Sequence, residues 1–132
     1  MNERQLLRAV RERAGLQTDA DAERTLAATV AAIASRLTYG EAHDLTDYLP
    51  GALRPAILNA LEPMAGLRFR PVEDLYEELA AKLRVPPAEA AHRVQSVARV
   101  LAEALPAAHL KEVRGQLPKG LRGLFDQPSI AR

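Results

Sequence analysis

The histidines and the acidic side chains beside them are the residues whose types and spacing could bind a metal ion. His43 and Asp47 lie four residues apart, with Asp44 between them, so on a helix His43 and Asp47 share one face and offer two ligands. That spacing is common on ordinary helices, and no His-Glu-x-x-His or Cys-x-x-Cys motif accompanies it. His109 stands beside a predicted helix start, where we expect an exposed residue of the capping region. The sequence therefore predicts no metal site and no bound cofactor.

Motifs of nucleophilic and phosphate chemistry are also missing from the sequence. No serine lies in a Gly-x-Ser-x-Gly setting, and no glycine-rich phosphate loop occurs. The acidic pairs at 73–74 and 77–78 are typical of the exposed start of a helix, where carboxylates favour the positive end of the dipole. We therefore expect no catalytic residues and a protein without enzymatic activity.

The second half of the chain repeats the first. Leu-Pro-Gly-Ala-Leu-Arg at residues 49–54 returns as Leu-Pro-Lys-Gly-Leu-Arg at residues 117–122, 68 positions later. The apolar register agrees at this offset over about 40 residues, which is too long a match for chance. The pattern predicts two tandem repeats, residues 3–66 and 70–126, followed by a flexible tail at 127–132. The matched apolar positions are Leu26 with Val94, Ile33 with Leu101, Leu37 with Leu105 and Leu45 with Val113.

Two acid–arginine pairs occupy equivalent places in the two repeats. Asp44 stands ten residues before Arg54, and Glu112 stands ten residues before Arg122, each across a corner that opens with a proline. A partly buried guanidinium at such a corner can bind the carboxylate and the carbonyl end of the preceding helix. Duplicated positions favour this structural role. The alternative is that Arg54 and Arg122 converge on the phosphate or carboxylate of a ligand in a pocket between the repeats.

The apolar periodicity and the positions of proline and glycine predict eight helices, four in each repeat. The fold class is therefore all-α, with two tandem four-helix repeats packed into one compact domain, residues 1–132, that has approximate two-fold pseudo-symmetry. The helices are expected at 3–14, from the Thr18 cap to about 37, at about 41–48 and from Pro50 to Pro63, then at 72–83, from Pro86 to about 105, around Leu110, Val113 and Leu117, and from Pro118.

Composition narrows the possible classes of protein further. The 132 residues are rich in alanine and leucine and only 4% aromatic, which favours closely packed helices. Cysteine is absent, so a disulfide framework and a thiolate metal site are excluded. No apolar run reaches the length of a membrane span and no signal peptide is evident, so we expect a cytoplasmic protein that does not contact a membrane.

The net charge of +1 gives no strong field for nucleic acid, and base stacking has few aromatics to use. Nucleic-acid binding is therefore unlikely to be the main function. Weak binding through the second repeat remains an alternative, because it carries the densest basic group. That group consists of Lys111, Arg114, Lys119 and Arg122.

The two Leu-Pro-x-x-Leu-Arg-like corners, each after a helix-break-helix pattern, resemble the bacterial family catalogued as domain of unknown function 2267. The resemblance covers the chain from about Leu6 to Phe125. It implies a small, all-helical, cytoplasmic bacterial protein without an assigned activity, and it brings no functional residues to carry over. We therefore expect a non-enzymatic interaction or assembly module whose partner is an unknown protein or a second copy of the chain. A small-molecule or anion-binding domain with a pocket between the repeats is the first alternative.

Overall fold

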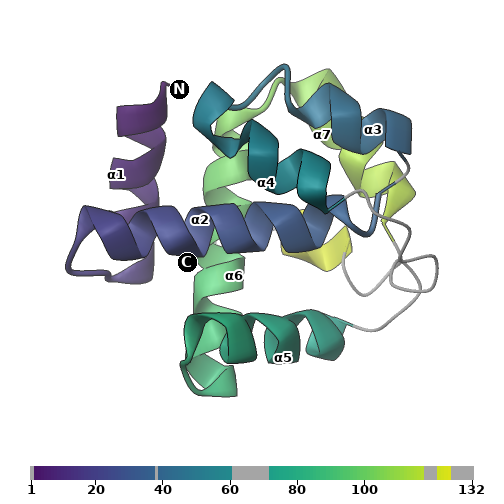
Figure 1. The fold of residues 1–132 in the computed structure, drawn as a ribbon. Coiled ribbons are helices and arrows are strands. Elements are labelled where there is room, and N and C mark those ends of the chain that lie inside the picture. Colours follow the sequence, from purple (N-terminus) through teal and green to yellow (C-terminus); the bar gives the residue numbers. More distant parts are fainter. Residues whose placement is uncertain (1, 38, 61–71, 118–121, 126–132) are drawn as a thin grey trace.

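Two long helices, α2 (Asp19–Ala34) and α6 (Pro87–Ala104), cross at the centre of the molecule (Figure 1). The regular elements in the described part of the chain are seven α-helices and two short 3₁₀ helices, without a strand. The fold is therefore all-α, as the apolar periodicity predicts. The computed structural model describes residues 2–37, 39–60, 72–117 and 122–125.

Helix α1 (Glu3–Ala14) has a hydrogen-bonded cap at each end and matches its predicted bounds. Asn2 Oδ1 accepts a hydrogen bond from Gln5 N at 2.8 Å, and Gln5 Oε1 accepts one from Asn2 N at 3.0 Å. This reciprocal pair satisfies amides that no helical carbonyl can reach. The helix stops at Gly15, whose φ of 71° is readily adopted by a residue without a Cβ.

A polar cap also starts α2, and short elements follow its end. Thr18 Oγ1 accepts a hydrogen bond from Asp21 N at 3.1 Å, as the sequence predicts for an N-cap. After α2 the chain forms α3 (Tyr39–Leu45), a 3₁₀ turn called η1 (Gly51–Leu53) and α4 (Arg54–Asn59). Helix α4 packs on both α2 and α3.

Three of the expected boundaries in this region differ from the structure. Helix α2 ends at Ala34 rather than near Leu37, because Ser35 Oγ and Arg36 Nη1 both donate to the carbonyl of Ala32, at 2.7 and 2.8 Å. Helix α3 ends at Leu45 rather than at Tyr48, because the next three amides bond to carbonyls three residues back instead of four. The residues after Pro50 form η1 before α4 begins.

The second half of the chain contains α5 (Val72–Leu83), α6, α7 (Ala107–Gln116) and a 3₁₀ turn called η3 (Gly123–Phe125). Helices α6 and α7 both end at a leucine with extended backbone, ψ 146° at Leu105 and ψ 145° at Leu117. Each of these leucines precedes a proline, which disfavours the helical conformation. The predicted stop at 63–66, helix opening at 118 and tail at 127–132 lie outside the described residues.

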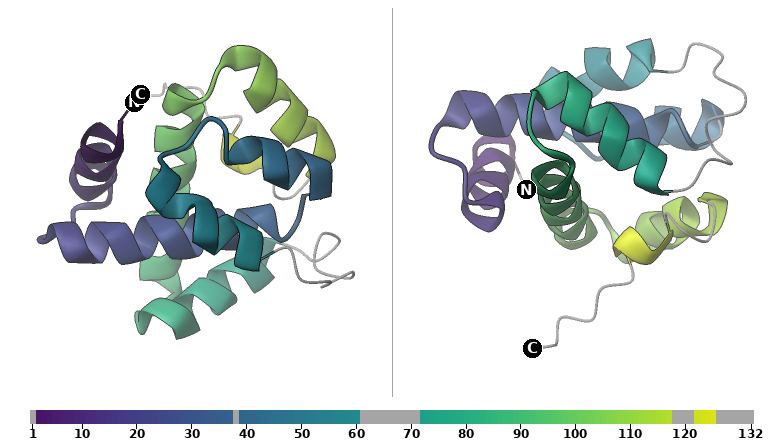
Figure 2. Two further views of the ribbon diagram at one scale, coloured as in Figure 1. Left: turned by 45° about the horizontal axis from the view of Figure 1, so that its top comes forward. Right: turned by 90° about the horizontal axis from the view of Figure 1, so that it is seen from below.

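One connected group of buried apolar side chains fills the interior. Helix α1 packs on α2 and α6, and α5 likewise packs on α6 and α2 (Figure 2). Leu6 of α1 and Leu75 and Leu79 of α5 have no exposed surface, and such burial is worth about 1.5–3 kcal/mol for each side chain. The described helices thus share one core, and none of them combines the length and apolar character needed to cross a membrane.

Candidate functional site

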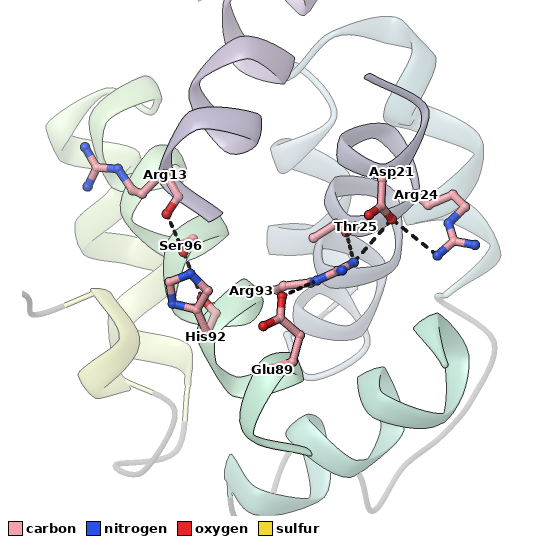
Figure 3. Close-up of polar contacts among 8 residues, drawn as sticks. All are labelled: Arg13, Asp21, Arg24, Thr25, Glu89, His92, Arg93 and Ser96. Atoms are coloured by element: carbon pink, nitrogen blue, oxygen red, sulfur yellow. Dashed lines mark hydrogen bonds and ion pairs between the residues drawn. The ribbon is translucent and has the colours of Figure 1, made fainter. Parts of the chain in front are cut away.

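Buried polar side chains interrupt the apolar interior in several places: Arg36, just after the end of α2, pairs with Glu78 of α5 at 3.4 Å, and two larger groups join helices elsewhere. The first, which we call the Arg93 cluster, joins Arg93 and Glu89 of α6 to Asp21 and Thr25 of α2 (Figure 3). Arg93 is only 8% exposed, and its Nε donates to Glu89 Oε2 at 2.9 Å. Its Nη1 donates to Asp21 Oδ1 at 3.2 Å and to Thr25 Oγ1 at 3.1 Å. Arg24 reaches the same Asp21 oxygen at 3.4 Å, so two guanidinium groups face two carboxylates.

A second set of contacts near the Arg93 cluster ties α1 to α6. Ser96 Oγ donates to His92 O at 2.8 Å and lies 3.4 Å from Arg13 O at the end of α1 (Figure 3). Arg13 also forms an ion pair with Glu103 of α6, at 2.8 Å. Together with the Arg93 cluster, which joins α2 to α6, these contacts hold three helices at their crossing, and we assign them a structural role.

The second polar group, which we call the acidic corner, consists of Glu41 and Asp44 of α3 with His109 and Glu112 of α7. Glu41 and His109 are 4% and 5% exposed, and Oε2 of Glu41 lies 3.1 Å from Nδ1 of His109. Each helix contributes two side chains three residues apart, which places both on one face. Glu41, His109 and Glu112 offer ligand-type atoms that all lie within 4.8 Å of one another. The ring of Tyr48 packs on the imidazole with 4.4 Å between ring centroids.

The buried pair in the acidic corner has shifted pKa values. The pKa of Glu41 is raised from 4.5 to about 7, mainly by burial and also by the carboxylates of Glu112 and Asp44 and by a hydrogen bond with Glu112. Burial lowers the pKa of His109, while the negative charges of Glu112, Asp44 and Asp47 oppose that shift. A carboxyl group that titrates near neutral pH against an imidazole is suited to exchanging its proton, either with solvent or for a metal cation.

A groove of about 480 Å³ lies between α2, α4 and α5, and we call it the alanine groove. It is lined mainly by small side chains, with two cationic residues, Arg24 and Lys82, among them. A larger cavity of about 780 Å³ follows α1, but its charged side chains already form the ion pairs Arg8–Glu12 and Arg11–Asp19. The other residues lining the alanine groove are Ala27, Ala28, Ala31, Ala56, Asn59, Ala60 and Leu83.

Family membership follows from a match over nearly the whole chain. The pattern of the family described as "Uncharacterized conserved protein (DUF2267)" matches residues 3–124, from the start of α1 into η3. The chain belongs to the DUF2267 family. The resemblance read from the two Leu-Pro corners is therefore confirmed, while no curated protein matches the chain. The DUF2267 description names no activity that could be assigned to the acidic corner or the alanine groove.

The four residues of the predicted acid–arginine pairs are all exposed in this DUF2267 chain. Asp44 and Glu112 belong to the acidic corner. Among the described residues, no hydrogen bond or ion pair joins Asp44 to Arg54, or Glu112 to Arg122. Arg122 Nη2 instead donates to Leu117 O at 3.3 Å, a contact with the end of the preceding helix of the kind the sequence analysis expects. Neither arginine lines the alanine groove.

The expected exposure of His109 in the capping region is wrong. The side chain is buried against Glu41 and Tyr48, because α7 turns its third residue toward α3. Leu110, one of the apolar residues that predict this helix, is only partly buried, since the inward face of α7 carries His109 and Val113. Asp47 is exposed and acts on His109 through its charge.

Sequence reasoning missed the acidic corner, although the 68-residue spacing noted in the sequence contains a signal for it. Glu41 and His109 are separated by the repeat offset of 68, and so are Asp44 and Glu112. Positions that match in two symmetry-related units meet each other when they lie near the axis between the units. Matched polar residues on the short helices were therefore candidates for a shared cluster in this DUF2267 protein.

Proposed function

We propose that this chain is a non-enzymatic, cytoplasmic interaction module that binds a helix of a partner protein in the alanine groove. The observation that carries the proposal is the groove itself, where alanines of α2 and α4 lie beside two cationic side chains. Small side chains allow the backbone of a docked helix to approach closely, and an amphipathic helix in a groove is a recurring recognition mode. The absence of cysteine suits a reducing compartment.

The charge of the groove specifies the kind of helix that fits. Arg24 and Lys82 come from different helices, and 60% of the Arg24 side chain is exposed although it contacts Asp21 at 3.4 Å. A partner helix with a small apolar face and acidic residues along its flank complements this lining. Charge pairs at the rim of an interface mainly raise the association rate, so binding should weaken as salt increases.

We further propose that the domain arose as two tandem four-helix repeats related by approximate two-fold pseudo-symmetry. Contacts between matched positions support this, since Thr25 meets Arg93 and Glu41 meets His109, each pair 68 residues apart. Arg93 also holds two carboxylates, Asp21 and Glu89, that are matched at the same offset. The reciprocal packing of α1 on α6 and of α5 on α2 is what a two-fold arrangement of two such units predicts.

The ends of α1 and α5 give the repeat independent support. Gly15 and Arg84 each directly follow the last residue of their helix, and both have positive φ, 71° and 58°. In both places the following amide bonds back to a carbonyl five residues earlier, Leu16 N to Arg11 O at 2.9 Å and Val85 N to Ala80 O at 3.1 Å. The two helices thus share one type of ending, which is consistent with descent from one ancestral unit.

Partner capture with groove variants tests the proposed interaction. The full chain is immobilised as wild type, as Ala28→Trp, which fills the groove, and as Ala88→Trp, which adds the same bulk to an exposed position of α6. Proteins captured from the source cells are identified, and the segment they contribute is synthesised as a peptide for calorimetric titration. We expect binding to survive Ala88→Trp and to fall by about tenfold or more in Ala28→Trp.

Two further outcomes decide the question. Charge reversal by Lys82→Glu should weaken binding of the same peptide and reduce the salt dependence of that binding. Peptide binding that is equal in wild type, Ala28→Trp and Lys82→Glu would contradict the proposal, provided that circular dichroism shows both variants folded.

A small acidic molecule is a second candidate occupant of the same groove. The volume of about 480 Å³ falls in the range of ligand pockets, and the groove lies between the first-repeat helices α2 and α4 and the second-repeat helix α5. A thermal-shift screen with carboxylated and phosphorylated metabolites separates the two candidates. A stabilisation by several degrees that is lost in Ala28→Trp and retained in Ala88→Trp favours the small ligand.

A further inference from the structure

The acidic corner brings together three side chains of the types that bind divalent metal ions. Glu41 comes from α3, whereas His109 and Glu112 come from one face of α7, and their ligand-type atoms lie within 4.8 Å of one another. Figure 1 shows the two short helices side by side, and the contacts of Glu41 and Tyr48 with His109 join them. The repeated spacing along the two helices is therefore what assembles this group.

The imidazole of His109 supplies the nitrogen ligand of this group, and it is buried. His109 is only 5% exposed, and its Nε2 has no hydrogen-bond partner among the described residues. A neutral imidazole has one donor nitrogen and one acceptor nitrogen, and leaving either unused in a buried place is costly. Nδ1 faces Glu41 Oε2 at 3.1 Å, so a neutral imidazole with its proton on Nε2 presents the lone pair of Nδ1 to an ion shared with Glu41.

The distances fit a small metal ion. Two ligands on a tetrahedral zinc ion, with bonds of about 2.0–2.1 Å, lie roughly 3.3 Å apart. The 3.1 Å between Glu41 Oε2 and His109 Nδ1 already has this spacing. Glu112 is exposed and already hydrogen-bonds the side chain of Glu41, so its side of the cluster gives an ion a path from solvent.

We propose that Glu41, His109 and Glu112 bind one divalent transition-metal ion of the Zn²⁺ class at the contact between α3 and α7. An imidazole with two carboxylates suits Zn²⁺ and related ions, whereas Mg²⁺ and Ca²⁺ prefer ligand sets made of oxygen alone. Asp44 and Asp47 add negative charge that attracts the cation. Three protein ligands leave one position of a tetrahedral ion for water. The ion also fastens matched positions of the two repeats to each other.

Calorimetric titration of the metal-free full chain tests this site. Zn²⁺, Mn²⁺ and Mg²⁺ are titrated at pH 8 into wild type, Glu112→Gln and a matched control, Glu73→Gln, an exposed glutamate of α5. The exposed His92→Ala controls for histidine binding at the surface. We expect one Zn²⁺ per chain, weaker binding of Mn²⁺ and no detectable binding of Mg²⁺. Glu112→Gln should weaken Zn²⁺ by about tenfold or more, while both controls stay within about twofold of wild type.

Nuclear magnetic resonance of the wild-type imidazoles gives a readout that needs no variant of a buried residue. Zn²⁺ should shift a ring nitrogen of His109 selectively and leave those of His43 and His92 in place. The proposal is overturned if Zn²⁺ shifts His43 or His92 instead, if Mg²⁺ binds as tightly as Zn²⁺, or if Glu112→Gln binds Zn²⁺ like Glu73→Gln. The alanine groove shares no residue with this metal site, so a negative result for metal binding leaves the proposed partner binding unaffected.

Discussion

The Arg93 cluster and the acidic corner are built in the same way but reach opposite electrostatic outcomes. Each joins residues 68 positions apart, Thr25 with Arg93 in one and Glu41 with His109 in the other. In the Arg93 cluster, the guanidinium groups of Arg93 and Arg24 balance two carboxylates. In the acidic corner, carboxylates surround a histidine whose pKa is lowered by burial. Residues 68 positions apart thus meet in both groups, but the spacing does not decide what they do.

The contrast separates a structural cluster from a candidate binding site. Arg93 uses Nε to bind Glu89 within α6 and Nη1 to bind Asp21 and Thr25 of α2, so its guanidinium joins the two helices. His109 leaves Nε2 unused, and its neighbour Glu41 holds its proton up to about pH 7 because burial raises its pKa. Balanced charge favours stability, whereas excess negative charge inside the fold is retained at a cost that a bound cation removes.

The largest expected effect comes from breaking the Arg93 cluster. Arg93→Met keeps the volume but removes the bonds to Asp21, Glu89 and Thr25, so the free energy of unfolding should fall by roughly 3–4 kcal/mol. Arg24→Met is the matched control, because Arg24 binds the same Asp21 but 60% of its side chain is exposed. Its effect should stay below about 1 kcal/mol. Urea denaturation followed by circular dichroism measures both, and equal losses would show that burial is not what gives Arg93 its importance.

A pH-dependent effect of somewhat smaller size is expected in the acidic corner. The pKa of Glu41 is about 7 in the folded chain against 4.5 as its ordinary value, so the folded state holds a proton that the unfolded state releases. Its contribution to stability is full below about pH 4.5 and is lost as the pH rises through about 7. Glu41→Gln mimics the protonated form. Relative to wild type it should therefore gain roughly 2–3 kcal/mol between pH 4.5 and pH 8.

The opposing group in this experiment is His109, whose lowered pKa reduces stability as the pH falls below its ordinary value of 6.5. Comparing the variant with wild type at each pH largely removes that term, because both proteins contain the histidine. The measurement is urea denaturation at several pH values with a chelator present, so that no metal occupies the site. A difference that does not change with pH would contradict the raised pKa of Glu41.

Sequence patterns predicted the helices better than they predicted the site, for a physical reason. The bounds of α1 and α5 follow from local signals, such as the Gly15 stop, and both match. The site depends on contacts across 68 residues that no local pattern encodes. His109 shows this most clearly, because its place near a helix start predicts exposure while the packing of α7 on α3 buries it.

A smaller effect should distinguish two buried threonines of α2. Thr25 Oγ1 accepts a hydrogen bond from Arg93 at 3.1 Å, whereas Thr29 Oγ1 has no partner among the described residues, and both side chains are fully buried. Thr25→Val should lower the free energy of unfolding by about 1 kcal/mol, because it removes an acceptor from a charged donor. Thr29→Val should be neutral or stabilising, because it replaces an unpaired hydroxyl by a methyl group. Urea denaturation of the two variants compares their free energies of unfolding. A larger loss in Thr29→Val than in Thr25→Val would show that Thr25 does not contribute to the Arg93 cluster.

The smallest expected effect concerns the ion pair between Arg13 and Glu103. Its atoms lie 2.8 Å apart, closer than any pair in the Arg93 cluster, but 35% and 51% of the two side chains are exposed. Solvent screening should therefore limit its coupling energy to about 0.5 kcal/mol in a double-mutant cycle with Arg13→Ala and Glu103→Ala, and high salt should remove most of it. A coupling as large as that between Arg93 and Asp21 would mean that distance, and not burial, decides the strength of ion pairs in this fold.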